Sequence, residues 1–188
     1  MPLSPPAARR PLHRRVIEMR GFAREDGLFD IEGHLVDTKD QGFTTIDRGV
    51  APDAPLHGMR IRLTIDDEML IHHCEAVTEH SPYRMCPDAA PNFARLAGLR
   101  IGGGFNKAVA ERVGGTLGCT HLREMLAQLA TVAFQTTYES RRARRGDWRP
   151  GDKRPALVGT CLAYAEDSRI TAAQWPGFTA ATPEPAKP

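Results

Sequence analysis

The sequence has no long hydrophobic run, few aromatic residues and little net charge, and each shortage argues against a class of protein. No segment of the 188 residues approaches the roughly 20 apolar residues that a membrane-spanning helix needs. The first fifteen residues contain no apolar run of signal-peptide length. A net charge of +2 is too small to indicate nucleic-acid binding. The sequence therefore predicts a soluble cytoplasmic protein that binds neither membranes nor nucleic acids.

Cysteine is scarce as well. The four cysteines, Cys74, Cys86, Cys119 and Cys161, are widely spaced, and no export signal accompanies them. Thiols of this kind stay reduced in the cytoplasm, so we expect no disulfide framework. With 41% hydrophobic residues, the chain is rich enough in apolar side chains for one domain with a core.

Composition divides the chain into four segments. Residues 1–12 are rich in proline and are predicted to be a disordered tail. Residues 13–150 are predicted to form a single α+β domain. Residues 151–178 contain a short apolar stretch, which predicts an extension that packs on the core. Residues 179–188 contain mainly Pro and Ala and are predicted to be a second disordered tail.

Alternation of apolar and polar residues predicts four strands, at residues 14–23, 28–36, 59–65 and 70–78. The Asp26-Gly27 pair indicates a hairpin turn between the first two, because glycine readily adopts positive φ. Residues 37–40 are expected to be a polar turn or an irregular extension. Neighbouring strand residues face opposite ways, so one of His72 and His73 is expected to be buried and the other solvated.

Helical spacing follows in the second half of the chain. Ala90 to Ala97 and Phe105 to Val113 are expected to be short helices, separated by the glycines at 102–104. From Leu122 onward, apolar residues recur at steps of three and four, which predicts a longer helix with Thr120 as its N-cap. The sequence therefore predicts an α+β fold, with a small antiparallel sheet and helices packed on one side.

The stretch Gly114 to Leu122 is the first candidate site, because its glycines bring Cys119 and His121 to the start of the long helix. The helix dipole can favour a thiolate there, and the imidazole can donate to it, accept a proton or bind a metal. Cys119 can equally be a small buried hydrophobic residue and His121 a solvated residue of the first turn.

A second group of candidates lies in two proline-containing loops. His57 follows the loop at residues 49–55 and shares the inward face of the next strand, so its imidazole needs a partner such as a carboxylate, a carbonyl or a ligand. The loop at 81–87 contains Tyr83, Arg84 and Cys86 beside two prolines. Its plain interpretation is a connection between a strand and a helix.

Four motifs in fixed order, DGLFDIEGHLVDTK, HGMRIRLTID, PYRMC and GCTHL, resemble those of a proteobacterial family known only as a domain of unknown function. The similarity covers about residues 14–135. The family is associated with bacteria that degrade aromatic compounds, and this association implies a small catabolic substrate.

The chain also resembles, more distantly, the iron-sulfur scaffold and sulfur-acceptor proteins. The likeness lies in the succession of antiparallel strands, a cysteine loop and a Cys-Ser/Thr-x-Leu start to a long helix, here Cys119 to Leu122. It implies a scaffold-like fold, with Cys86 and Cys119 at positions of cluster ligands. The chain departs from that pattern in having Gly118, where the scaffold has a histidine, and no cysteine loop near Asp66.

Two functions follow as hypotheses. The first is a cofactor-independent acid-base enzyme, a lyase that releases a small aldehyde from a phenolic catabolic substrate, with a possible homodimer as its assembly. His57 or His121 is its base, Tyr83 an acid or phenol anchor, and Arg84 an anion partner, while Cys119 is a further catalytic candidate and Cys86 lies at the substrate.

The alternative is a metal-binding or sulfur-handling protein. Cys86, Cys119, His121 and His57 together offer thiolates and imidazoles, which suit tetrahedral zinc or an iron-sulfur cluster. The arginine-rich segment at residues 141–145 is most simply interpreted as a solvated helix end, since arginine is favoured near helix C-termini.

Overall fold

The computed structural model describes residues 3–146, 149 and 152–178. The chain forms two compact units, Met1–Glu139 and Ser140–Pro188, and each is described by itself. Residues 3–12 are exposed and have no regular secondary structure. The tail predicted at residues 179–188 lies outside the described residues.

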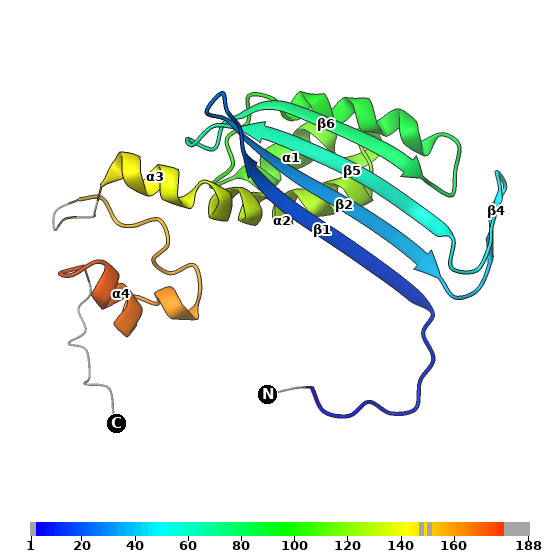
Figure 1. Ribbon diagram of the computed structural model, residues 1–188, viewed down its shortest axis with the longest axis horizontal. Coiled ribbons are helices and arrows are strands. Elements are labelled where there is room, and N and C mark those ends of the chain that lie inside the picture. Colours follow the sequence, from blue (N-terminus) through cyan, green and yellow to red (C-terminus); the bar gives the residue numbers. More distant parts are fainter. Residues whose placement is uncertain (1–2, 147–148, 150–151, 179–188) are drawn as a thin grey trace. The chain divides into compact units, whose positions relative to one another are not determined.

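The first unit is built on a four-stranded antiparallel sheet with the order β1-β2-β5-β6 (Figure 1). The strands are β1 (His13–Ala23), β2 (Phe29–Lys39), β5 (Pro55–Ile65) and β6 (Ile71–His80). All four overlap the predicted strands, but β5 begins four residues earlier than predicted, at Pro55, inside the loop expected at residues 49–55. The turn between β1 and β2 contains Gly27 at φ +84°, as the Asp-Gly pair predicts.

Strand β2 is longer than expected: at residues 37–39 the polar turn does not form, and the other alternative, an irregular extension, is the one observed. Asp37, Thr38 and Lys39 continue the pairing with β1, and Asp37 also pairs with His57 of β5. A register shift follows between Asp37 and Thr38. Between β2 and β5, the short strands β3 (Phe43–Thr44) and β4 (Gly49–Val50) form a separate two-stranded sheet.

A register shift between β5 and β6 determines the exposure of the adjacent histidines His72 and His73. The register of β5 and β6 shifts so that Thr64 pairs with His73 and Ile65 pairs with Ile71. His72 is the extra residue, and it turns outward with His73, so both are exposed. The expectation that one of the two is buried is therefore wrong, because the bulge breaks the alternation at this point.

The helical segments of the first unit are η1 (Cys86–Leu96), α1 (Phe105–Val113), η2 (Gly115–Leu117) and α2 (Thr120–Thr136). Segment η1, expected as a helix over residues 90–97, starts earlier and has 3-10 geometry with Pro91 inside it, where proline removes a backbone donor. Helix α1 has the predicted bounds. The N-cap of α2 is Cys119 and not Thr120.

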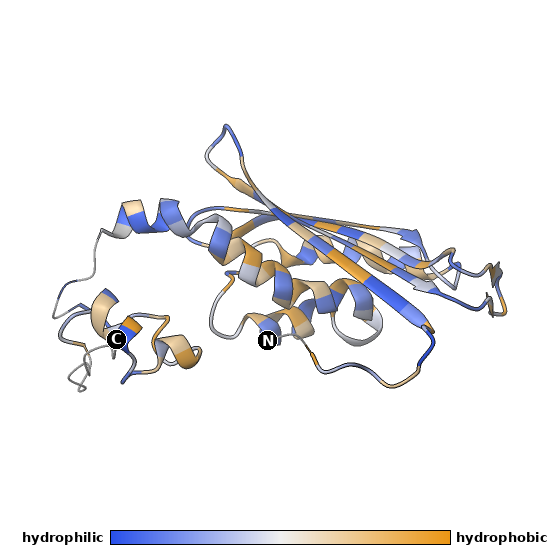
Figure 2. Cartoon of the chain, turned by 60° about the horizontal axis from the view of Figure 1, so that its bottom comes forward, coloured by the Kyte–Doolittle hydropathy of each residue, from blue (hydrophilic) through white to orange (hydrophobic). Residues whose placement is uncertain are grey.

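Helix α2 closes the core against the sheet. It contacts β1, β2 and β5, while η1 contacts β6, and both views place the helices of this unit on one face of the sheet (Figures 1 and 2). The predicted apolar face supplies all the buried residues of α2 up to Thr136, namely Leu122, Met125, Leu126, Leu129 and Ala133, while its other two members, Ala130 and Phe134, are half-buried. The predicted α+β architecture is therefore confirmed.

Helix α3 (Tyr138–Arg145) spans the division between the two units. The second unit also contains η3 (Leu162–Tyr164) and α4 (Arg169–Gln174). The ring centroids of Tyr164 and Trp175 lie 5.6 Å apart, and the Ser168 side chain accepts a hydrogen bond from Thr171 N at the start of α4. The expected packing of residues 151–178 on the core stays a prediction.

The glycines between α1 and α2 are there for packing. A Cβ atom on Gly114 would lie 2.2 Å from the carbonyl oxygen of Ala110, and one on Gly118 would lie 2.1 Å from that of Val113. These glycines therefore allow a close approach of backbone to backbone. It lets the chain reverse over the end of α1 and start α2 directly.

We predict that Gly118→Ala destabilises the protein by roughly 1–3 kcal/mol, because the new methyl group meets a fixed carbonyl. Urea denaturation followed by circular dichroism measures the change. Gly102→Ala is the matched control, since a Cβ atom there meets nothing within 4 Å, and its unfolding midpoint should stay close to that of the unmodified protein. Equal stability of both variants would show that the loop between α1 and α2 adapts freely.

Candidate functional site

Three strands and one helix place polar side chains at one end of the sheet. Arg15 of β1 pairs with Asp37 of β2, and Asp37 pairs with His57 of β5. These directly opposed residues are on the face that α2 covers, because they share the alternation of the buried Leu35 and Met59. The first turn of α2 adds His121 to the same place.

Asp37 is at the centre of this group, and its side chain is only 1% exposed. Arg15 holds it with two hydrogen bonds, Nε to Oδ1 at 2.7 Å and Nη2 to Oδ2 at 2.8 Å. Nδ1 of His57 lies 3.1 Å from Oδ2, and Nε2 of His13 lies 3.4 Å from Oδ1. Arg15 also donates from Nη1 to Glu124 at 2.8 Å, which ties β1 to the first turn of α2.

Asp37 is an ionised carboxylate in this setting. Burial raises the pKa of its carboxyl group, but the hydrogen bonds and charge of Arg15 outweigh burial, so the pKa lies below its ordinary value of 3.8. An ionised carboxylate can only accept hydrogen bonds. Nδ1 of His57 must therefore carry the proton, and Nε2 is left with a free lone pair.

His121 lies against His57, with ring centroids 3.9 Å apart and planes tilted by 32°. Its Nε2 is 3.9 Å from Oδ2 of Asp37, which is too long for a hydrogen bond. Its Nδ1 is 3.8 Å from Sγ of Cys119. Both imidazoles remain partly open to solvent, since the side chain of His57 is 15% exposed and that of His121 is 23% exposed.

The site disfavours charged imidazoles. Burial lowers the pKa of His57 below its ordinary 6.5, and the neighbouring His121 lowers it further, while Asp37 works in the opposite direction. Burial also lowers the pKa of His121, and the charge of Arg15 adds to that effect. Two neutral imidazoles, one of them fixed by a carboxylate, can accept and return protons at neutral pH.

The same group is the candidate metal site. Among the described residues, Asp37, His57 and His121 are the only set of three or more His, Cys, Asp or Glu whose ligand atoms lie within 4.8 Å of one another. Cys119 and Asp37 face different nitrogens of His121, so one ion cannot take both of them together with that imidazole. Arg15 already occupies both oxygens of Asp37.

The structure brings His57, His121 and Cys119 together and leaves the other sequence candidates apart. Tyr83 is 43% exposed, and its carbonyl oxygen accepts a hydrogen bond from Ser81 Oγ. The backbone N–H of Arg84 donates to Asp47. Cys86 starts η1 as a half-buried free thiol. Among the described residues, no hydrogen bond, ion pair or ring contact joins these three to Asp37 or the histidines.

Sequence reasoning missed Asp37, Arg15, His13 and Glu124. Asp37 follows Ile31, Gly33 and Leu35 at steps of two, so continuing the alternation would have placed a carboxylate on the buried face. The inward orientation of His57, and its need for a polar partner, are confirmed. That partner is Asp37.

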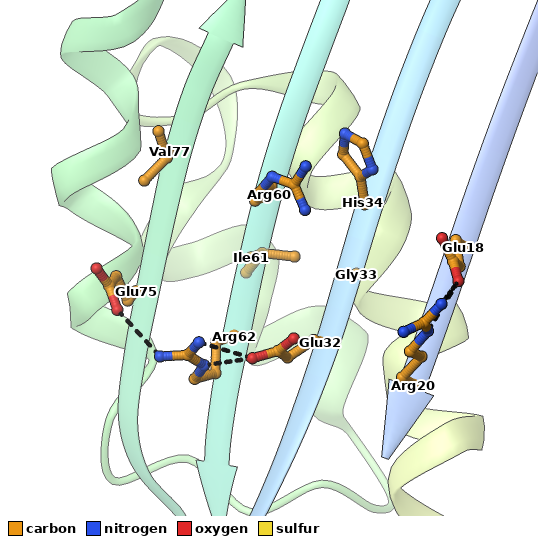
Figure 3. Close-up of a pocket in the computed structure, with 10 residues that line it drawn as sticks. All are labelled: Glu18, Arg20, Glu32, Gly33, His34, Arg60, Ile61, Arg62, Glu75 and Val77. Carbon is orange, nitrogen blue, oxygen red and sulfur yellow. Dashed lines mark hydrogen bonds and ion pairs between the residues drawn. The ribbon is translucent and has the colours of Figure 1, made fainter. Parts of the chain in front are cut away.

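A hollow of about 510 Å³ lies elsewhere, on the open face of the sheet (Figure 3). Its arginines are all paired: Arg20 binds Glu18 and Arg62 binds Glu32 and Glu75 within the lining, while Arg60 binds Glu79 outside it. This ladder of opposite charges keeps the open face hydrated. It presents none of the chemistry of the buried carboxylate and histidines.

Residues 13–135 match a family described as protein of unknown function (DUF2889). The chain belongs to that family. The match spans all four strands of the sheet and nearly all of α2, and so it covers every residue of the candidate site. No curated protein and no solved structure shows a significant match to the chain. No helix in the described residues of this DUF2889 protein is long and apolar enough to cross a membrane.

We predict that the free energy of unfolding falls as the pH is lowered from 7.5 to 5. Because the pKa of His57 and of His121 in the folded protein lies below the ordinary 6.5, the unfolded chain binds protons that the folded chain rejects. Their contribution is thus fully present above pH 6.5 and is lost as the pH falls below it. Urea denaturation across this range measures the slope.

Two double variants isolate the source of that slope. His57→Gln/His121→Gln should flatten it, because the two depressed groups are gone. His73→Gln/His80→Gln should leave it unchanged, since both of these histidines are exposed. An unchanged slope in the first variant would refute the assignment.

Proposed function

We propose that the protein is an acid-base enzyme in which Nε2 of His57 is the general base. The hydrogen bond from Nδ1 to the buried carboxylate of Asp37 carries the proposal. It fixes the tautomer and the orientation of the ring, and Asp37 stabilises the imidazolium that forms when Nε2 takes a proton. Arg15 holds Asp37 in place and keeps it ionised.

His121 is the second proton carrier of the proposal. Its ring stacks on His57 but makes no hydrogen bond to Asp37, so the two imidazoles differ in basicity and can divide the roles of base and acid. Sγ of Cys119 lies near Nδ1 of His121 and can share a proton with it. The proposal gives Tyr83, Arg84 and Cys86 no part in proton transfer.

The reaction class is that of a cytoplasmic lyase on a small phenolic compound. A base removes the proton of a hydroxymethyl group, the carbon-carbon bond breaks, and formaldehyde leaves. The electron pair stays on the ring-bearing carbon, which then takes up one proton. Such a retro-aldol step conserves atoms and needs only a placed base, an acid and an acceptor for the developing charge, which the substrate's own conjugated ring can supply.

We predict that His57→Gln lowers kcat about 10²–10⁴-fold, the usual effect of removing a general base, and that Asp37→Asn lowers it too by releasing the imidazole. The assay is formaldehyde release from a panel of phenolic compounds with hydroxymethyl side chains. In the unmodified enzyme, kcat/KM should rise with pH through a value below 6.5, because the pKa of His57 is depressed.

His72→Gln is the matched control, because His72 forms an exposed pair with Asp66, with Nε2 and Oδ2 2.9 Å apart. This variant should turn over normally. Full activity of His57→Gln would contradict the proposed base. Release of formaldehyde from none of the compounds would contradict the lyase assignment.

A metal-binding function is the second candidate, favoured by the convergence of Asp37, His57 and His121. Two imidazoles and one carboxylate suit zinc and other divalent transition metals. The guanidinium of Arg15 opposes a cation there, because it neutralises the only carboxylate of the set. The iron-sulfur alternative instead requires Cys86 beside Cys119 and His121.

Titration calorimetry with Zn²⁺ separates these possibilities. If Asp37, His57 and His121 bind the ion, His121→Gln should abolish binding, and Arg15→Met should tighten it because a competing positive charge is gone. Cys86→Ser should have no effect. Loss of binding in Cys86→Ser, or a visible charge-transfer band in protein purified without added metal, would favour the cysteine-based site.

A further inference from the structure

Strand β1 is an unprotected edge of the sheet. It is 11 residues long, and in the described part of the chain it pairs on one side only, with β2 (Figure 1). The other side presents a row of backbone N–H and C=O groups that can pair with another strand. No proline or bulge interrupts β1, although both are common devices for blunting an edge.

The outward face of β1 carries a short pattern that is complementary to itself. Val16, Glu18, Arg20 and Phe22 alternate along it. Val16 is 37% exposed and Phe22 is 43% exposed. Glu18 and Arg20 lie between these two apolar residues, and in the single chain they pair with each other (Figure 3).

We infer that β1 is a homodimer interface, at which a second copy of this chain adds its own β1 antiparallel to the first, with Met19 on the twofold axis. In this register Glu18 lies opposite the partner's Arg20 and Arg20 lies opposite the partner's Glu18. Val16 lies opposite the partner's Phe22. Directly opposed residues of antiparallel strands are close enough for both kinds of pair to stabilise the contact.

The neighbouring symmetric registers are less favourable because they place like charges opposite each other. A twofold pairing that preserves the hydrogen-bonding pattern must shift by whole residues about one central position. Centring it on Glu18 sets two carboxylates against each other, and centring it on Arg20 sets two guanidinium groups together. The charge pattern therefore selects Met19.

The inward face fits the same register. Ile17, half-buried against the core, lies opposite the partner's Gly21, and Met19 lies opposite the partner's Met19. Both contacts extend the apolar layer between sheet and helices. At the ends Arg14 faces the partner's Arg24, which is neutralised within its own chain by Asp26 and Asp30.

A charge exchange tests the interface without reference to any activity. The unmodified protein should sediment as a dimer at micromolar concentration. Glu18→Arg alone and Arg20→Glu alone should each lower the dimer fraction at least tenfold, because each sets like charges against each other. The double variant Glu18→Arg/Arg20→Glu should dimerise again, because the pairs are restored with reversed sign.

Glu111→Arg, a charge change on an exposed position of α1, is the control and should leave the dimer intact. Circular dichroism confirms that each variant is folded. A monomeric unmodified protein at 100 μM, a concentration about a hundred times above micromolar, would overturn the inference. So would a double variant that is folded and as monomeric as the single ones.

A cysteine at the axis tests the register itself. Opposed residues of paired strands lie within the Cα separation that a disulfide spans. Met19→Cys should therefore form an intermolecular disulfide under mild oxidation, identified by the linked peptide. Ile17→Cys is the control and should form far less, because its counterpart lies four residues further along the partner strand. Equal yields would refute the twofold axis at Met19.

Discussion

The buried carboxylate of Asp37 is the constraint on which the candidate site depends. A charge at this depth is costly unless it is paired and hydrogen-bonded, and Arg15 meets that requirement with two parallel bonds. Because Arg15 and Asp37 are on adjacent strands, and Asp37 and His57 on the next pair, the pairing of the strands builds the arrangement. The second link of Arg15, to Glu124, fixes α2 relative to the sheet and so sets the position of His121.

That arrangement explains why the two histidines are suited to proton transfer. Burial lowers the pKa of both imidazoles, with further lowering from His121 at His57 and from Arg15 at His121, while the carboxylate orients only one of them. The pair is asymmetric although its members are the same residue type. A metal ion would use the same lone pairs but would have to share the carboxylate with Arg15. The two proposed functions thus differ in the cation that neutralises Asp37: Arg15 in the enzyme, and a metal ion in the metal-binding protein.

Irregularities in the strands matter as much as their regular parts. The register shift after Asp37 ends the regular pairing directly beside the site, a position where such bulges often re-aim side chains. The bulge at His72 leaves both neighbouring histidines exposed, so that pair, the most visible histidine motif in the sequence, has no part in the site. Gly114 and Gly118 also contribute to the site, because the absence of a side chain lets the backbone pack closely enough for α2 to start against the end of α1.

The sequence by itself determined the four strands, the first hairpin and the long helix, because alternation and helical spacing are local signals of burial. It also determined that His57 faces inward and that Cys119 and His121 lie at a helix start. The partners of His57 were decided only by the tertiary structure. Asp37, His57 and His121 are far apart in the chain, and strand pairing and helix packing bring them together. The alternation before Asp37 indicates which face its side chain takes, but whether the polar residues Asp37 to Lys39 continue the strand depends on the strands beside them.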